Sequence, residues 1–171
     1  MRQRSQILLL SGTLFALGAC TNAVAPPAPA AVTVTVRAES VDPVVTTAGS
    51  VTWVKFALPL RFENTGATSV RVEPCASYIE SRSGTTWRSA WSPVCAAGGA
   101  SLRDIPPGET RDVEIQVAAA LSGPGAPRWD AASMDVPLRY QAGYVGLGVS
   151  GRIPTVASNE FTLGSSHKAR P

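Results

Sequence analysis

Apolar and polar residues alternate along much of the chain from residue 32 onward. The alternation is clearest over Val32–Glu39 and Val113–Val117, and a longer run over Val51–Phe62 is expected to break or bulge at Pro59. Side chains that repeat every two residues lie on opposite faces of an extended chain, so this pattern predicts half-buried β-strands. The other predicted strands are Val70–Glu73, Tyr78–Arg82, Thr85–Arg88, Leu138–Val145 and Phe161–Leu163.

Turn-forming residues separate these strands. Ser83-Gly84 lies between two of them and predicts a hairpin, while Asn64-Thr65-Gly66 and Ile105–Glu109 predict turns in which glycine accepts a positive φ. No long helix is predicted; Ala118–Leu121 could form one helical turn, which Gly123, Pro124 and Gly125 would end. About eight short strands with turns at this spacing predict an all-β fold, an antiparallel β-sandwich of about seven to nine strands over residues 32–164.

The composition supports a single folded domain. The chain has 171 residues, 44% of them hydrophobic and 16% charged, which is too apolar for a disordered protein. The formal net charge of +3 includes Arg2 and Arg4, and it falls to +1 without the first 19 residues. The remaining arginines are dispersed, whereas nucleic-acid binding needs a concentrated basic surface, so we expect no nucleic-acid partner.

Residues 1–19 have the pattern of a secretory signal peptide. Arg2 and Arg4 precede an apolar run over Ile7–Leu17, which is shorter than the roughly 20 residues that span a bilayer. Leu17-Gly18-Ala19-Cys20 resembles the bacterial lipobox, which implies cleavage before Cys20 and lipidation of its thiol. The alternative is an ordinary signal peptide that ends near a cysteine.

Residues 20–31 are expected to form a tether between the lipidated cysteine and the domain. Pro26, Pro27 and Pro29 favour an extended, semi-rigid spacer. Thr21 follows Cys20, so the aspartate that retains some lipoproteins in the inner membrane is missing. The expected location is therefore the bacterial cell envelope, with the lipid in the outer membrane if the cell has two membranes. Residues 165–171 are expected to form a flexible tail.

Cys75 and Cys95 are the two cysteines that remain after Cys20. An exported protein folds in an oxidising compartment, so this pair predicts a disulfide. Metal binding and free thiols are the alternatives. His167 is the only histidine, so a zinc site of cysteine and histidine ligands cannot be completed.

Signals for enzyme chemistry are weak. Gly146–Gly151 matches the glycine spacing of a dinucleotide-binding loop, but Pro154 stands where the required helix should continue. A serine-histidine-aspartate triad would depend on His167 near the chain end. The acidic residues between Glu109 and Glu114 are interpreted as the solvated face of a strand. We expect no catalytic residues, no cofactor and no bound metal.

Trp87 and Trp91 are candidate binding residues. They lie four residues apart, so in a regular strand they would share one face and could hold a glycan or a partner protein. The alternative is that they pack in the core over the expected disulfide.

Several short segments, in this order, resemble bacterial immunoglobulin-like domains of envelope lipoproteins. The matching segments are Pro59–Gly66, Val70–Val72, Gly84–Trp87, Trp91–Cys95, Ile105–Glu109, Leu138–Tyr140 and Ser158–Phe161. The likeness extends from about Ala57 to Leu163, and the insert Ser122–Arg128 departs from it. It implies an immunoglobulin-like sandwich with a binding or structural role and no shared catalytic residues.

The expected function is therefore that of a lipid-anchored, non-enzymatic envelope protein with a binding or structural module. Its partners would be the membrane, through the N-terminal lipid, and an envelope protein or glycan. The alternative is an inhibitor of envelope proteases or other hydrolases, which an exposed, rigid loop at Ser122–Arg128 would favour.

Overall fold

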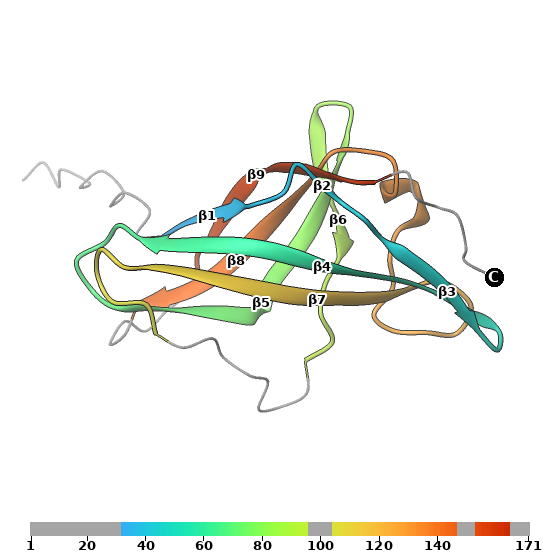
Figure 1. Cartoon of the computed structure of the whole chain (residues 1–171), viewed down its shortest axis with the longest axis horizontal. Helices are drawn as coiled ribbons and strands as arrows, with labels where there is room; N and C mark the ends of the chain where they lie inside the picture. Colours follow the sequence, from blue (N-terminus) through green and yellow to red (C-terminus); the bar gives the residue numbers. More distant parts are fainter. Residues whose placement is uncertain (1–31, 96–103, 147–152, 165–171) are drawn as a thin grey trace, which may run out of the picture.

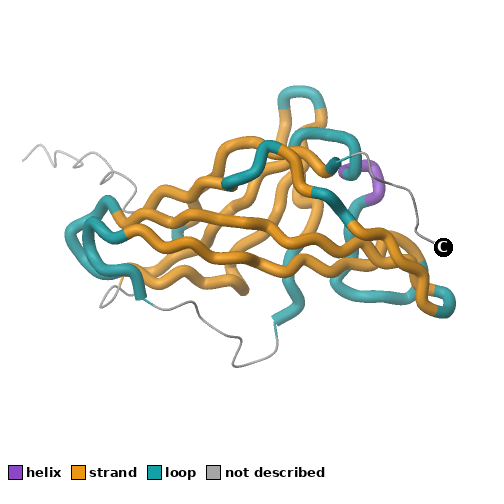
Figure 2. The backbone as a smooth tube through the Cα atoms, in the orientation of Figure 1, coloured by secondary structure: helices purple, strands orange, loops and turns teal. Residues whose placement is uncertain are grey.

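The computed structural model describes residues 32–95, 104–146 and 153–164, which form two facing β-sheets (Figure 1). The expected signal peptide, Cys20, the tether and the tail at 165–171 all lie outside the described residues. Strands account for most of the described chain, as the tube view shows (Figure 2). The prediction of an all-β sandwich is therefore confirmed.

The first sheet is built around one long strand, β4. This strand pairs antiparallel with β7 on one side, and with β3 and then β1 on the other. The bounds in this sheet are β1 (Val32–Val36), β3 (Val44–Ala48), β4 (Val51–Asn64) and β7 (Thr110–Ser122). Because β4 alone joins the other three strands, β1, β3 and β7 all lie at edges of the sheet.

The second sheet has the order β2-β9-β8-β5-β6. Its pairs are antiparallel except for β2 with β9, which run parallel. The bounds are β2 (Ser40–Val41), β5 (Val70–Ser83), β6 (Thr86–Trp91), β8 (Leu138–Gly146) and β9 (Thr155–Leu163). The predicted hairpin is the β5–β6 connection, where Gly84 takes a φ of +62°. The described residues contain one short 3-10 helix, Ala131–Ser133.

The core lies between the sheets and is formed by the inward-facing residues of both. On β4 these side chains alternate with solvated ones and end in Leu58, Leu60 and Phe62, all fully buried. Tyr140 of β8 and Phe161 of β9 face them from the second sheet and are exposed by 2% or less. Burial of each large apolar side chain contributes about 1.5–3 kcal/mol, so this layer dominates the stability of the domain.

Pro59 does not break β4, contrary to the prediction. The Arg37 N–H donates to the Pro59 carbonyl at 2.9 Å, so the nitrogen of Pro59 also points away from its β7 partner, Glu114. On that side β3 pairs only as far as Lys55 and β1 begins at Leu60. The Pro59 nitrogen therefore faces Arg37, one residue beyond the end of β1, so the missing N–H leaves the ladders of β4 with β1 and with β7 intact.

The helical turn predicted at Ala118–Leu121 is also wrong, because these residues continue β7. Ala119 and Ala120 are fully buried and pair with Val54 and Trp53 of β4. Helix propensity favours alanine only weakly, and here the continuous ladder with β4 overrides it.

The Asn64 side chain fastens one end of the sandwich. Its Nδ2 donates to the carbonyls of Thr68 and Ile105, both at 2.8 Å, and its Oδ1 accepts the Gly66 N–H at 2.9 Å. Asn64 is fully buried at the end of β4. One side chain therefore forms the predicted turn and also joins it to the segment that leads into β7.

The two lateral sides of the sandwich differ. On one side, Asn159 of β9 bridges to β1: its Oδ1 accepts the Val36 N–H at 2.7 Å, and its Nδ2 donates to the Val36 carbonyl at 3.2 Å. On the other side, β7 and β6 are the edge strands of their sheets. The second side carries the groove described next.

Candidate functional site

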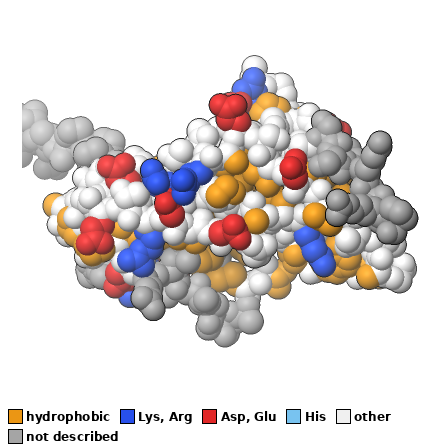
Figure 3. All heavy atoms as spheres, in the orientation of Figure 1, with side chains coloured by type: hydrophobic (Ala, Val, Ile, Leu, Met, Phe, Trp, Pro, Cys, Tyr) orange, Lys and Arg blue, Asp and Glu red, His pale blue; other side chains and the backbone are white. Residues whose placement is uncertain are grey.

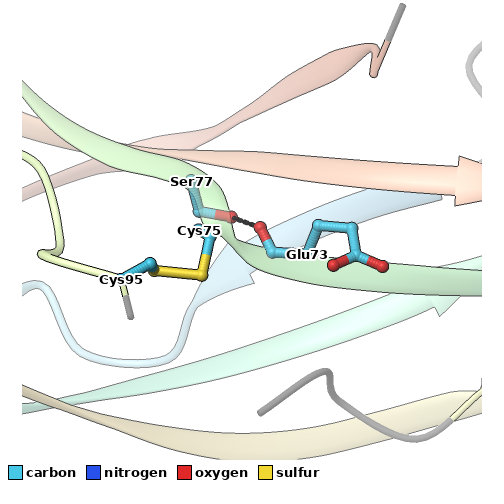
Figure 4. Close-up of a disulfide and its surroundings, with 4 residues drawn as sticks. All are labelled: Glu73, Cys75, Ser77 and Cys95. Carbon is cyan, nitrogen blue, oxygen red and sulfur yellow. Dashed lines mark hydrogen bonds between the residues drawn. A yellow bond between two sulfur atoms is a disulfide. The ribbon is translucent and has the colours of Figure 1, made fainter. Parts of the chain in front are cut away.

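The disulfide predicted from the sequence is present in the structure. Cys75 and Cys95 are joined with their Cα atoms 5.7 Å apart (Figure 4). Cys75 lies in a bulge of β5, where the pairing with β8 shifts between Glu73 and Tyr78. Cys95 follows β6, so the bond holds the chain after this edge strand against the bulge.

Ser77 supports this bulge from within. Its hydroxyl donates to the Glu73 carbonyl at 2.9 Å (Figure 4). It also accepts the Gly143 N–H at 3.0 Å, and the two bonds replace ladder bonds that the bulge interrupts. A Cβ on Gly143 would lie 2.6 Å from the Ala76 Cβ, so the bulge packs directly on Gly143, and a residue with a side chain would not fit there. The cystine is thus attached to a rigid part of the second sheet.

Trp87 and Trp91 do not share a face, contrary to the expectation. Trp87 pairs with Arg82 and Trp91 pairs with Ile79, but between them Ser89 pairs with Glu80. Ala90 is therefore an extra residue in β6, and one inserted residue reverses the face of everything that follows. Trp91 is 7% exposed and belongs to the core, whereas Trp87 is half-buried on the outer face.

Trp87 stacks with a charged residue instead of forming an open platform. The Arg139 guanidinium carbon lies 4.2 Å from the centre of the Trp87 ring, and its Nε bonds to Glu80 Oε2 at 2.7 Å. The same carboxylate oxygen accepts from Gln141 at 2.8 Å. A guanidinium over an indole is an attractive pair, so this cluster is a satisfied part of the second sheet.

An apolar groove lies beside the disulfide, between the two sheets, with a volume of about 310 Å³. Its lining comes from the end of β6 and the residues after it, from β7, from β8, from the β5 bulge and from Pro127. We call it the β7 groove, and its principal lining residues are Pro74, Trp91, Pro93, Val94, Ile115 and Tyr140. The sequence did not reveal this groove, because its lining residues come from five separate parts of the chain.

Two lining residues differ sharply in exposure. Val94 is 69% exposed, which is unusual for a large apolar side chain in the described part of the protein. Tyr140 is 1% exposed, and its burial raises the pKa of its hydroxyl to about 12. The Nε1 of Trp91 has no hydrogen-bond partner among the described residues. The groove thus has an exposed apolar rim and a buried floor.

Charges gather on the outer face of the first sheet, away from the groove. Asp112 of β7 accepts from Arg61 Nε at 2.8 Å and from Arg37 Nη1 at 3.0 Å. The bond from Arg61 is the main cause that lowers the pKa of the Asp112 carboxyl. In Figure 3, acidic and basic side chains are spread over this face, with hydrophobic side chains among them and along its lower border.

Glu114, the next outward residue of β7, is different. Its Oε1 accepts from Gln116 Nε2 at 2.7 Å, and it forms no ion pair with any residue that the structure describes. Within the described ranges, no three histidine, cysteine, aspartate or glutamate residues lie close enough together to hold a metal ion. His167 and residues 147–151 of the glycine-rich motif lie outside the described residues.

The segment Ser122–Arg128 folds back onto the sheet. The Ala120 N–H donates to the Pro127 carbonyl at 2.8 Å, and Arg128 Nη1 donates to the Gly123 carbonyl at 3.2 Å. A Cβ on Gly123 would lie 2.2 Å from the Ser50 carbonyl oxygen, so the segment is in close contact with the β3–β4 turn. It does not project from the sandwich as a free loop would.

No helix in the described ranges has the length and apolar character needed to cross a bilayer.

Comparisons with known proteins identify no family for this chain. No protein-family model matches the sequence, and no curated protein matches it. The structural genomics target SoR45 is 13% identical with a TM-score of 0.46, over 80% of this chain and 89% of that one. A Bordetella pertussis protein with the provisional name ApaA is 19% identical with a TM-score of 0.40, over 79% and 95% of the two chains. Both TM-scores lie below 0.5, so neither likeness bears on function.

Proposed function

We propose that the protein is a lipid-anchored, non-enzymatic module of the bacterial cell envelope that binds another envelope protein. The observation that carries this proposal is the β7 groove, with its exposed Val94 and its buried floor of Trp91 and Tyr140. Apolar concavities with aromatic side chains at their centre are typical of protein–protein contact sites. The lipobox at Cys20 and the immunoglobulin-like resemblance support the envelope location and the binding role.

The groove favours a protein partner over a glycan. Its principal lining residues are apolar, whereas a sugar requires polar groups that hydrogen-bond its hydroxyls. Trp87, the half-buried residue that could have stacked on a sugar, is already paired with Arg139. An inhibitor would need a projecting loop, and Ser122–Arg128 is held against the sheet, so we favour the binding module.

Site-specific photocrosslinking tests the proposal in cells. A benzoylphenylalanine residue at position 94 of the full-length protein should give a discrete protein adduct in the native host. The matched control is position 44, because Val44 is also an exposed valine (58%) but lies on β3, across β4 from β7. An adduct at 44 of equal yield, or none at 94, would show that the groove is not the binding surface.

A further inference from the structure

The outer edge of β7 has backbone N–H and C=O groups that form no hydrogen bond with any residue the structure describes. The Ala120 N–H donates to the Pro127 carbonyl, and the Ala120 carbonyl accepts from the Trp129 N–H at 2.9 Å. The backbone N–H and C=O groups of Ala120 therefore point away from β4. The ladder with β4 is regular from residue 110 to 120, and backbone direction alternates with each residue. The N–H and C=O groups of Asp112, Glu114, Gln116 and Ala118 therefore point outward too. None of the hydrogen bonds within the described ranges uses them.

This free edge borders the β7 groove. Ile115 and Gln116, in the middle of the edge, both line it. Leu58, the β4 partner of Ile115, is fully buried, whereas Ile115 itself is only partly buried. Ile115 lies on the edge strand, and no described strand pairs with the outer side of β7 at this residue. A further strand beside β7 would cover Ile115 and direct every second side chain into the groove.

Natural sheets usually protect such an edge with charged residues, lysine above all, or with proline or a bulge. Between Asp112 and Ala118, β7 has no lysine, proline or bulge: its sequence is Asp-Val-Glu-Ile-Gln-Val-Ala, and its pairing shows no irregularity there. Its two charged residues are both acidic, and a sheet edge beside an apolar groove is the arrangement that strand addition uses.

Charge indicates what the added strand should carry. Asp112 is already paired with two arginines, but Glu114 has no cation partner in the described part of the chain. Side chains directly opposite each other on neighbouring strands interact, and opposite charges stabilise the pair. The position opposite Glu114 on an added strand therefore favours lysine or arginine.

We infer that the β7 edge binds an extended segment of a partner protein, with apolar residues at alternate positions and a basic residue opposite Glu114. The segment would form hydrogen bonds with the backbone from Asp112 to Ala118 and insert its apolar side chains into the β7 groove. The inference rests on the proposed function and specifies the chemistry of its partner.

Peptide binding tests the inference with a defined probe. The probe is a fluorescein-labelled peptide, Lys-Val-Thr-Val-Lys-Val-Thr, which matches the seven residues of the free edge. Its control has the same composition with the three valines adjacent. Fluorescence anisotropy with the full-length protein should give saturable binding of the alternating peptide and at least tenfold weaker binding of the control. Equal binding of the two peptides, or no binding of the probe, overturns the inference.

Variants of β7 separate backbone addition from simple apolar contact. Gln116→Pro removes an outward N–H without removing a bond to β4, and it should weaken probe binding about fivefold to tenfold. Gln116→Ala removes the same side chain but keeps the N–H, so it measures the share of the side chain, and Gln116→Pro should bind the probe at least fivefold more weakly than Gln116→Ala. Near-ultraviolet circular dichroism verifies that both variants are folded. Unaltered binding by folded Gln116→Pro contradicts strand addition.

Charge reversal tests the residue opposite Glu114. Glu114→Lys should weaken binding of the lysine probe about threefold and strengthen, by a similar factor, binding of a probe with glutamate in place of lysine. If Glu114→Lys does not change which of the two probes binds more tightly, the inference of a basic residue opposite Glu114 is wrong. If the crosslink at position 94 forms while all peptide results are negative, the proposed function stands and strand addition is wrong.

Discussion

Replacement of Asn64 by alanine tests how the sandwich end is held together. The substitution removes three side-chain hydrogen bonds, to the Thr68 and Ile105 carbonyls and from the Gly66 N–H. Each contributes about 1 kcal/mol net, so Asn64→Ala should lower the free energy of unfolding by about 3 kcal/mol. The Ile105 carbonyl still accepts the Val70 N–H at 3.0 Å, so we add no penalty for an orphaned buried acceptor. Such a loss is a large part of the roughly 5–15 kcal/mol of a typical domain.

Urea denaturation followed by tryptophan fluorescence measures this loss, with Asn159→Ala as the matched control. The Asn159 side chain also bonds to the backbone, because it accepts the Val36 N–H and donates to the Val36 carbonyl, but Asn159 is exposed to solvent. Water can replace those bonds, so the control should lose only about 1 kcal/mol. The midpoint should fall without a change of slope. Equal losses from the two variants, or a loss below about 1 kcal/mol for Asn64→Ala, would refute the reasoning.

Asn64→Asp adds a pH test of the same contacts. An ionised carboxylate cannot donate to the Thr68 and Ile105 carbonyls, and burial also disfavours its charge, so the pKa of the introduced carboxyl is raised in the folded state. A raised folded-state pKa means that the folded protein binds the proton more tightly than the unfolded chain. Stability should therefore fall as the pH rises above about 4, the unfolded value for aspartate. Asn64→Ala should show no such additional dependence.

Three further predictions concern other parts of the protein. Cys75→Ser and Cys95→Ser should each cost about 3 kcal/mol of unfolding free energy, measured in urea, and the double variant should cost no more than either; an additive loss contradicts a single shared bond. Cys20→Ala should abolish incorporation of labelled palmitate in the native host, and retained label contradicts the lipobox. The pKa of Asp112 is lowered by its bond from Arg61, so this pair stabilises the folded state above about pH 4 and the contribution disappears as the pH falls further. The unfolding midpoints of Asp112→Asn and of the wild type should therefore converge at low pH, and a difference between them that does not change with pH contradicts this prediction.

Strands with clear alternation could be predicted from the sequence, and short or irregular ones could not. Val32–Val36 alternates because one face of β1 is buried and the other is solvated. β3 was missed, since Val44–Ala48 lies on an exposed edge and has no buried face to impose a pattern. Ala118–Leu121 was assigned to a helical turn because local propensity contains no information about the ladder with β4.

The candidate site was only partly predictable. The pairing of Cys75 with Cys95 followed from the cysteine count and the export signal, and needed no knowledge of the fold. The separation of Trp87 from Trp91 depends on the extra residue Ala90, and nothing in the local sequence indicates which residue of a strand is unpaired. The free edge of β7 could not be predicted either, because the sequence does not show which strands pair and therefore which strand lies at an edge of its sheet.

The position of β9 has a consequence for the order in which the protein folds. This last strand is the neighbour of β8, the parallel partner of β2 and, through Asn159, the support of β1. Contacts between the two ends of a chain form slowly, because the intervening loop must first be closed. β1 and β2 are synthesised early but cannot form these contacts until β9 has been synthesised, so their apolar faces remain exposed until then. A chain that ends before Thr155 should aggregate rather than fold, since its first strands never acquire their last neighbour.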